Sequence, residues 1–260
     1  MTSIKDSKCV LVTGATSGIG RALAQCIARL PSKPCVIAVG RRQERLDELA
    51  KEGLETVQLD VEASYDALKK FADEIILKYP NLDSIIFCAG VQHEFNFKGE
   101  VDLSNVVSEI NINYTSVVAL ISLFLPHLLS LGAQGRKCSI IPVTSGLAIV
   151  PAPWVLNYSA SKAALHSFSV SLRAQLKNTN VHVMEVIPPL VESELHDAYG
   201  TTEKLSRFWM PLEEYTTKTM EGLENGDVYI TTGNIQGVFE KFEKGKDELA
   251  EQFQKRREEW

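Results

Sequence analysis

The sequence predicts an α/β protein with a doubly wound parallel sheet and helices on both of its faces. Short apolar runs alternate with longer stretches of helical spacing from residue 9 to residue 187. The runs are continuously apolar, which is typical of parallel strands buried on both faces. A glycine-rich turn joins the first run to the first helical stretch. No repeat, linker or low-complexity segment interrupts the chain, so residues 1–260 are expected to form a single domain.

The first half of the chain supplies three strand–helix units. The apolar runs at 9–12, 35–39 and 56–59 are short and contain valine, which favours strands. Each run precedes a stretch whose apolar residues recur at helical spacing, and these stretches cover 21–30, 44–50 and 67–77.

The second half continues the same alternation. Strands are expected at 84–88, 139–144 and 181–187, and helices at 104–129 and 159–176. Pro126 lies near the end of the first of these helices. Because proline lacks a backbone N–H, Pro126 should kink or end that helix.

Two later segments depart from the alternation. Residues 192–215 form either a loop that covers a ligand or a helix pair packed on the edge of the sheet. Residues 236–260 are expected to form an amphipathic helix, because four large apolar residues recur at spacings of seven, four and seven. These four are Phe242, Leu249, Phe253 and Trp260. Such a stripe usually packs on its own protein or on a subunit partner.

Composition disfavours several classes of protein. The chain is 45% hydrophobic and 23% charged, as in an ordinary globular protein, and its net charge of −6 disfavours a nucleic-acid partner. The polar start leaves no room for a signal peptide, and no apolar run reaches transmembrane length, so no membrane partner is expected. The five cysteines show neither C-x-x-C nor metal-ligand spacing. Reduced core thiols and a cytoplasmic location are therefore expected.

The glycine-rich turn predicts a dinucleotide site of the Rossmann type. It reads Thr-Gly-Ala-Thr-Ser-Gly-Ile-Gly at 13–20, between a strand and a helix. Glycines permit a tight turn and close approach of the backbone, while the helix N-terminus binds phosphate. Its spacing, G-x-x-x-G-x-G, differs from the common G-x-G-x-x-G. The residues expected to contact the cofactor here are Gly14, Thr16, Ser17, Gly18, Ile19 and Gly20.

The end of the second strand favours NADP(H) over NAD(H). An NAD site usually carries a carboxylate about 20 residues after the fingerprint, where it binds the ribose 2′-hydroxyl. Here Arg41 and Arg42 occupy that place, 21 residues after Gly20 in the case of Arg41. Guanidinium groups bind a 2′-phosphate, although one of them could be a solvated residue at a helix start. Asp60, beside Val61, either accepts from the adenine amine or caps the next helix.

A tyrosine and a lysine four residues apart predict acid–base chemistry. Tyr158 and Lys162 fall on one face of a helix, 13 residues after Ser145 in the case of the tyrosine. An ammonium about 4 Å from a phenolate would stabilise it by roughly 4 kcal/mol at an effective dielectric constant near 20. That energy corresponds to about three pKa units, so the lysine is expected to bring the phenol into a useful range.

Together these motifs resemble the short-chain dehydrogenase/reductases of the single-domain type, over residues 8–195. The matching pieces are Thr13-Gly14-x-x-x-Gly18-x-Gly20, Leu59-Asp60-Val61, Ala89-Gly90, Asn113, Ser145 and Tyr158-x-x-x-Lys162. The resemblance implies that Ser145 binds the substrate carbonyl and that Tyr158 donates the proton. It implies that Lys162 binds the nicotinamide ribose and that Asn113 holds a proton-relaying water. Further cofactor contacts implied are Val61, Ala89, Gly90, Pro188, Val191 and Ser193.

The chain departs from the family pattern at several places, including Ser116, which stands where a glycine often follows the catalytic asparagine. Phe87-Cys88 replaces two asparagines before Ala89-Gly90, which removes a brace of the central strand. Pro188-Pro189 replaces the usual Pro-Gly, and Ser193 stands where a threonine often contacts the nicotinamide carboxamide. None of these changes removes a group that handles protons or hydride.

The expected function is that of an NADPH-dependent carbonyl reductase, or alcohol dehydrogenase in reverse. A small or medium apolar ketone, aldehyde or secondary alcohol is the expected substrate, with Phe95 and Phe97 able to line its site. A catalytically inactive NADP(H)-binding regulator or scaffold is the alternative. An epimerase or dehydratase is disfavoured by the fingerprint spacing. Relatives pair through the helices that match 104–129 and 159–176, so a homodimer or homotetramer is expected by analogy.

Overall fold

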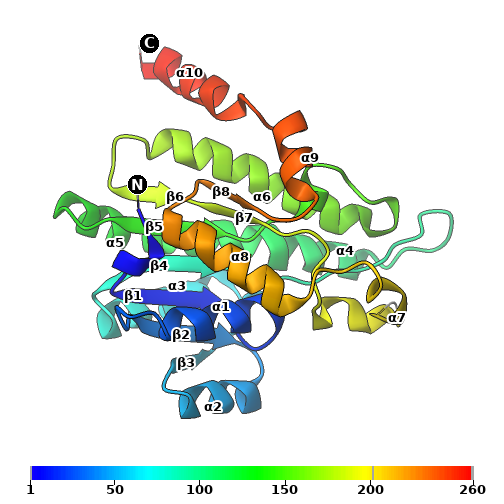
Figure 1. Cartoon of the computed structure of the whole chain (residues 1–260), viewed down its shortest axis with the longest axis horizontal. Helices are drawn as coiled ribbons and strands as arrows, with labels where there is room; N and C mark the ends of the chain where they lie inside the picture. Colours follow the sequence, from blue (N-terminus) through cyan, green and yellow to red (C-terminus); the bar gives the residue numbers. More distant parts are fainter. Residues whose placement is uncertain (1, 201, 259–260) are drawn as a thin grey trace.

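The computed structural model describes residues 2–200 and 202–258, and a parallel β-sheet forms its centre (Figure 1). The six strands follow the order β3-β2-β1-β4-β5-β6, and each neighbouring pair is parallel. They are β1 (Cys9–Thr13), β2 (Cys35–Gly40), β3 (Glu55–Gln58), β4 (Leu82–Phe87), β5 (Cys138–Pro142) and β6 (Val181–Val183). The strand order reverses direction between β1 and β4, which creates a crevice at their carboxyl ends.

Helices cover both faces of this sheet, as the sequence predicts (Figure 1). Alternate strand residues face opposite ways, so Leu11 belongs to one apolar core while Val10 and Val12 belong to the other. The first core is closed by α3 (Tyr65–Lys78), α5 (Ser116–Ala133) and α6 (Leu156–Gln175). The second is closed by α1 (Gly18–Ala28), α2 (Gln43–Lys51) and α8 (Leu212–Asn225). The doubly wound prediction is confirmed.

The expected strand at 181–187 is divided into two. Residues on either side of Met184 form β6 and β7 (Glu185–Ile187). Strand β7 pairs with β8 (Tyr229–Thr231), and a single bridge from Val186 to Val143 joins it to the end of β5. The prediction of one strand was wrong because a continuous apolar run does not reveal a change of pairing partner. Met184 still donates its backbone N–H to Ile140, so the two sheets remain joined edge to edge.

The long helix expected at 104–129 is interrupted by a turn that carries Asn113. It consists of α4 (Leu103–Ile110), one π-helical turn at Asn111–Thr115, and α5, in which Pro126 is accommodated without ending the helix. Leu103–Ala133 is long and apolar enough to cross a membrane by length and composition, contrary to the expectation above. In this structure its apolar side packs in the first core, through Leu120 and Phe124 among others.

The end of the chain docks on α6 by charged groups rather than by its apolar stripe. The expected single helix is two helices, α9 (Ile235–Phe242) and α10 (Lys246–Glu258), and α10 packs along α6 (Figure 1). Arg173 donates to Asp247 at 2.7 Å and Lys177 to Glu251. Phe242, Leu249 and Phe253 are 48%, 55% and 68% exposed. Of the two predicted partners of the stripe, its own protein does not bury these three residues, while packing on a subunit partner stays a prediction. Trp260 lies outside the described residues.

A buried histidine lies between two carboxylates where the end of the chain docks. His166 of α6 lies between Glu185, 2.8 Å from its Nδ1, and Glu243, 3.0 Å from its Nε2. Burial lowers the pKa of His166, but the two carboxylates outweigh burial and the net pKa is raised. Arg173 also pairs with Glu185 at 4.0 Å, and Lys246 with Glu243 at 2.7 Å.

We expect His166→Gln to be destabilising at acidic pH and progressively less so at alkaline pH. Because the folded-state pKa is raised, the contribution of the charged ring is full below about 6.5 and disappears as pH rises through the folded value. Thermal unfolding of both proteins between pH 5.5 and pH 9 would measure the difference. A gap between the two melting temperatures that stays constant with pH would show that His166 contributes packing and not charge.

Candidate active site

Nearly all the predicted site residues lie at the carboxyl edge of the sheet. The glycine-rich turn follows β1, the two arginines follow β2, Asp60 and Val61 follow β3, and Ala89 and Gly90 follow β4. Ser145 follows β5, while Pro188, Val191 and Ser193 follow β7. In parallel sheets this edge is where ligands bind, so the topology brings together residues far apart in sequence.

The glycine-rich turn has the geometry that a dinucleotide requires. Gly14 has a φ of +70°, and a Cβ there would lie 2.7 Å from the backbone nitrogen of Ala89. A Cβ on Gly20 would lie 2.5 Å from the carbonyl oxygen of Gly14. Ser17 precedes α1 and makes no side-chain cap, which leaves the first-turn N–H groups directed at the crevice. These residues fit the phosphates of a dinucleotide.

The arginines beside the turn are not equivalent. Arg42 donates from Nε and from a terminal nitrogen to the hydroxyl of Thr16, at 3.2 Å in each case. Arg41 instead lies 3.9 Å from Asp60 and is more exposed. The sequence analysis missed Arg45, which donates to the carbonyl oxygen of Thr16 at 3.2 Å. Its position on the first turn of α2, three residues after Arg42, was the available signal.

A threonine braces the end of the central strand, where the family's asparagines are absent. The hydroxyl of Thr13 accepts from the backbone N–H of Cys88 at 3.1 Å and of Ala89 at 3.3 Å. Thr13 thus ties the end of β1 to the end of β4, next to the turn.

Asp60 does not cap the next helix. Ser64 caps that helix instead, and Asp60 accepts a hydrogen bond from Glu62 N–H at 3.0 Å.

Three of the four predicted catalytic side chains meet in a buried group. Ser145, Tyr158 and Lys162 are 8%, 7% and 4% exposed. A hydrogen bond links Ser145 to the Tyr158 phenol. Lys162 donates to the carbonyl oxygen of Val143 at 2.9 Å, and its Nζ lies 5.7 Å from the centre of the tyrosine ring. A hydroxyl, a phenol and an amine therefore converge where β5 ends.

The electrostatics of this group differ from the expectation. Burial raises the pKa of Tyr158, and the hydrogen bond with Ser145 offsets this only in part. Burial lowers the pKa of Lys162 to about 8. The expected depression of the phenol pKa by the lysine is therefore absent here, because desolvation of a buried phenolate exceeds the attraction of a cation beyond hydrogen-bond reach.

Asn113 holds the substrate side of the site in place. Its amide oxygen accepts from Val91 N–H at 2.9 Å, and its amide nitrogen donates to Val91 carbonyl oxygen at 2.9 Å and to Ser161 at 3.0 Å. The π-helical turn directs this side chain toward α6. The side chain therefore joins the loop after β4 to the catalytic helix, while the water-holding role stays a prediction.

Comparison with protein-family models shows to which family a chain with these site residues belongs. The family model described as short chain dehydrogenase matches residues 8–204, which include every one of these side chains. The chain belongs to the short-chain dehydrogenase family. It is accordingly an oxidoreductase by family, and the resemblance inferred from the motifs is confirmed.

Individual relatives of this short-chain dehydrogenase agree with its fold. It is 36% identical to "Uncharacterized oxidoreductase DltE" of Bacillus subtilis (strain 168) over 248 residues, covering 94% of this chain and 95% of the relative. A closed form of serine dehydrogenase complexed with NADP+ is 28% identical, with a TM-score of 0.72 over 80% of this chain and 86% of that one.

Two structures of short-chain dehydrogenases from Burkholderia share the fold at 22% identity. The enzyme of Burkholderia cenocepacia J2315, in complex with NADP, has a TM-score of 0.77 and covers 95% of this chain and 97% of its own. The enzyme of Burkholderia phymatum, in complex with NAD, has a TM-score of 0.75 and covers 88% of this chain and 90% of its own.

This short-chain dehydrogenase also buries a carboxylate that the sequence analysis missed. Glu109 is fully buried and accepts from the backbone N–H of His93 and the side-chain amide of Asn157, both at 2.7 Å. Burial raises the pKa of Glu109, and the nearby Lys162 opposes that rise. Glu109 lies four residues before Asn113, and this helical spacing was the signal that could have found it.

The segment at 192–215 passes beside the nucleotide turn and ends in the first residues of α8. It contains a short helix, η5 (Glu194–Tyr199), and α7 (Thr202–Leu205), which buries none of its residues. Ser193 lies against the turn, since a Cβ on Gly18 would be 3.3 Å from that of Ser193. His196 contacts Gln92 in the loop after β4, at 3.2 Å. The last four residues of the segment begin α8, whose Tyr215 packs in the second core, and whether the rest of the segment covers a ligand stays a prediction.

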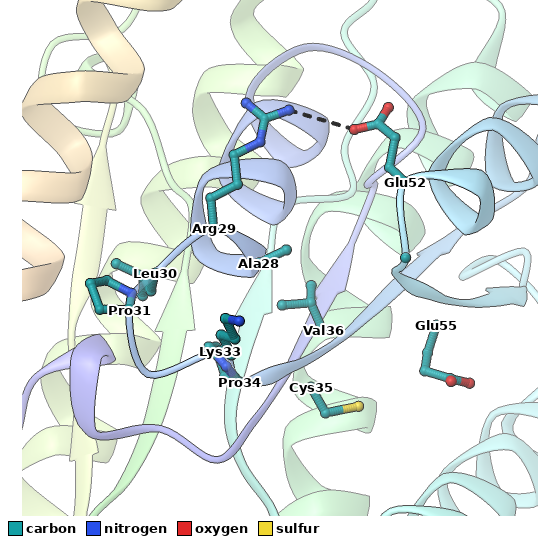
Figure 2. Close-up of a pocket in the computed structure, with 11 residues that line it drawn as sticks. Ala28, Arg29, Leu30, Pro31, Lys33, Pro34, Cys35, Val36, Glu52 and Glu55 are labelled. Carbon is teal, nitrogen blue, oxygen red and sulfur yellow. Dashed lines mark ion pairs between the residues drawn. The ribbon is translucent and has the colours of Figure 1, made fainter.

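A surface cavity of about 410 Å³ lies at the opposite edge of the sheet (Figure 2). Its lining includes Pro31, Pro34 and Cys35 at the start of β2, and the pair formed by Arg29 and Glu52 at 3.7 Å. None of the predicted site residues lines this cavity. Its place at the amino ends of the strands separates it from the chemistry.

Proposed function

We propose that this short-chain dehydrogenase is an NADPH-dependent carbonyl reductase, or an alcohol dehydrogenase in the reverse direction. The observation that carries the proposal is the buried convergence of Ser145, Tyr158 and Lys162 beside a turn able to cradle dinucleotide phosphates. The substrate class is a small or medium apolar ketone, aldehyde or secondary alcohol. Exposed Phe97 and Trp154 near the loop after β4 support an apolar entrance.

The residues have distinct parts in this chemistry. A nicotinamide bound at the crevice supplies or accepts the hydride. The hydroxyl of Ser145 donates a hydrogen bond to the substrate oxygen, and the Tyr158 phenol transfers its proton to that oxygen as negative charge develops. Lys162, with a pKa of about 8, exchanges protons readily near neutral pH and can return a proton to the Tyr158 phenolate after the phenol has given its own to the substrate. Asn113 positions the loop and helix that frame the carbonyl.

Preference for NADP(H) is supported by Arg42, Arg45 and the Thr16 hydroxyl, which gather beside the turn. Guanidinium forks bind phosphate with two hydrogen bonds, whereas a ribose 2′-hydroxyl gains little from them. The related structures described above include complexes with either cofactor, so the support for NADP(H) comes from the residues of this chain.

Oxidation of NADPH in the presence of a panel of carbonyl compounds tests the proposal. We expect at least one apolar aldehyde or ketone to be reduced, with NADH a poorer donor. Ser145→Ala should lower turnover by about 100-fold, since one oxyanion-type donor is typically worth that much. A protein that binds NADPH but reduces nothing in the panel would instead favour an NADP(H)-binding regulator.

Assembly and location are further parts of the proposal. Leu103 and Val107 of α4 are 66% and 58% exposed, and such apolar patches commonly mark subunit contacts, which supports a homodimer or homotetramer. The five cysteines are free thiols, which supports a reducing, cytoplasmic location.

A further inference from the structure

A carboxylate of the segment at 192–215 forms ion pairs with two arginines beside the nucleotide turn. Glu194 accepts from Arg42 at 2.7 Å through one oxygen and from Arg45 at 2.6 Å through the other. The same two arginines donate hydrogen bonds to Thr16, so two guanidinium groups, one carboxylate and one threonine meet at one place. A single anion bridging two guanidinium groups is the arrangement that a phosphate would adopt there.

The position of Glu194 links this cluster to the substrate side. It begins η5, immediately after Ser193, which lies against Gly18. Two residues further along the same short helix, His196 contacts Gln92 in the loop after β4. The segment therefore runs from the cofactor phosphates to the entrance of the catalytic group.

The cluster remains open to a ligand. The side chains of Arg42, Arg45 and Glu194 are 43%, 34% and 44% exposed. Burial favours the neutral form of Glu194, but its hydrogen bonds with both arginines outweigh burial and lower its pKa, so it is anionic at neutral pH. Partly exposed ion pairs are each worth less than about 1 kcal/mol, so a doubly charged phosphate can displace this carboxylate.

We propose that Glu194 is a cofactor-selectivity residue, which competes with a 2′-phosphate for Arg42 and Arg45. A nucleotide without that phosphate leaves the bridge intact, whereas one that carries it must displace Glu194 and so release the start of η5. This inference rests on the proposed function, since it assumes that the crevice binds a nicotinamide dinucleotide. The competition lowers the preference for NADP(H) that the arginines alone would give.

Calorimetric titration with two fragments tests the competition without any enzymatic assay. Adenosine 2′,5′-bisphosphate carries the 2′-phosphate, and adenosine 5′-monophosphate lacks it. We expect Glu194→Gln to tighten binding of the bisphosphate by about tenfold, because two ion pairs no longer compete. Binding of the monophosphate should change by less than about twofold.

Glu192→Gln is the matched control, since it removes one negative charge two residues away. Glu192 accepts from Leu212 N–H at 3.1 Å and forms no bond with either arginine. Equal tightening of both fragments by Glu194→Gln, or tightening by Glu192→Gln as well, would overturn the inference by showing a general charge effect. Weaker bisphosphate binding by Glu194→Gln would also overturn it.

The outcome separates this inference from the proposed function. If the wild-type protein binds neither fragment nor NADPH, both fail together. If it binds the bisphosphate and Glu194→Gln leaves that affinity unchanged, only the competition fails, and the reductase proposal stands.

Discussion

Tyr158→Phe is expected to lower turnover by a factor of about 100 to 10,000 while leaving NADPH binding nearly unchanged. Transfer by a positioned acid–base group contributes a rate factor of that size. The variant retains the ring packed beside Lys162 and loses only the hydroxyl that Ser145 contacts. Turnover on whichever carbonyl compound the wild type reduces, together with an NADPH titration, would measure both quantities.

Tyr79→Phe provides the matched control for this experiment. Tyr79 donates to Glu55 at 2.6 Å, near the start of β3 and away from the site, so the same atom is removed elsewhere. Turnover should then remain close to that of the wild type. Wild-type turnover in Tyr158→Phe would contradict the proton-transfer role directly.

Gly14→Ala is expected to abolish nucleotide binding and to lower stability substantially. A Cβ would lie 2.7 to 2.9 Å from backbone atoms of Cys88 and Ala89, at a φ of +70° that alanine rarely adopts. The strained backbone costs about 1–3 kcal/mol, and overlap in a packed region adds about 1–3 kcal/mol more. Thermal unfolding and NADPH titration would measure the two losses.

Gly135→Ala separates strain from overlap. Gly135 also has a positive φ, of +87°, but nothing lies within 4 Å of a Cβ built there. Gly135→Ala should lose only the stability that the strained backbone costs, and it should bind NADPH as the wild type does. If Gly14→Ala were no worse than Gly135→Ala, then the close approach of the turn to β4 would be unimportant.

The sequence predicted the parts of this molecule that depend on local pattern. Six apolar runs and a glycine-rich turn were enough for the doubly wound sheet, and helical spacing placed Tyr158 and Lys162 on one face. These features depend on residues close together in the chain, where periodicity is a reliable signal.

The features that sequence reasoning missed depend on contacts across the fold. The bridge from Glu194 to Arg42 spans 152 residues, and that from Asn157 to Glu109 spans 48. The pKa of Tyr158 depends on how completely the phenol is desolvated, and a helix pattern carries no measure of that. The division of the strand predicted at 181–187 likewise depends on which strands lie next to its two halves, and the residues of the run do not show this.

The acidic side chains from Glu243 onward have a consequence for synthesis of the protein. His166 and Arg173 of the catalytic helix, and Lys177 just after it, bond to carboxylates that follow them by 77, 74 and 74 residues in the chain. A ribosome makes the positive members of these pairs well before the negative ones. The nascent catalytic helix must therefore remain incompletely neutralised until the last helices emerge, and a messenger shortened at its 3′ end would yield a chain whose oxidoreductase core lacks its final electrostatic partners.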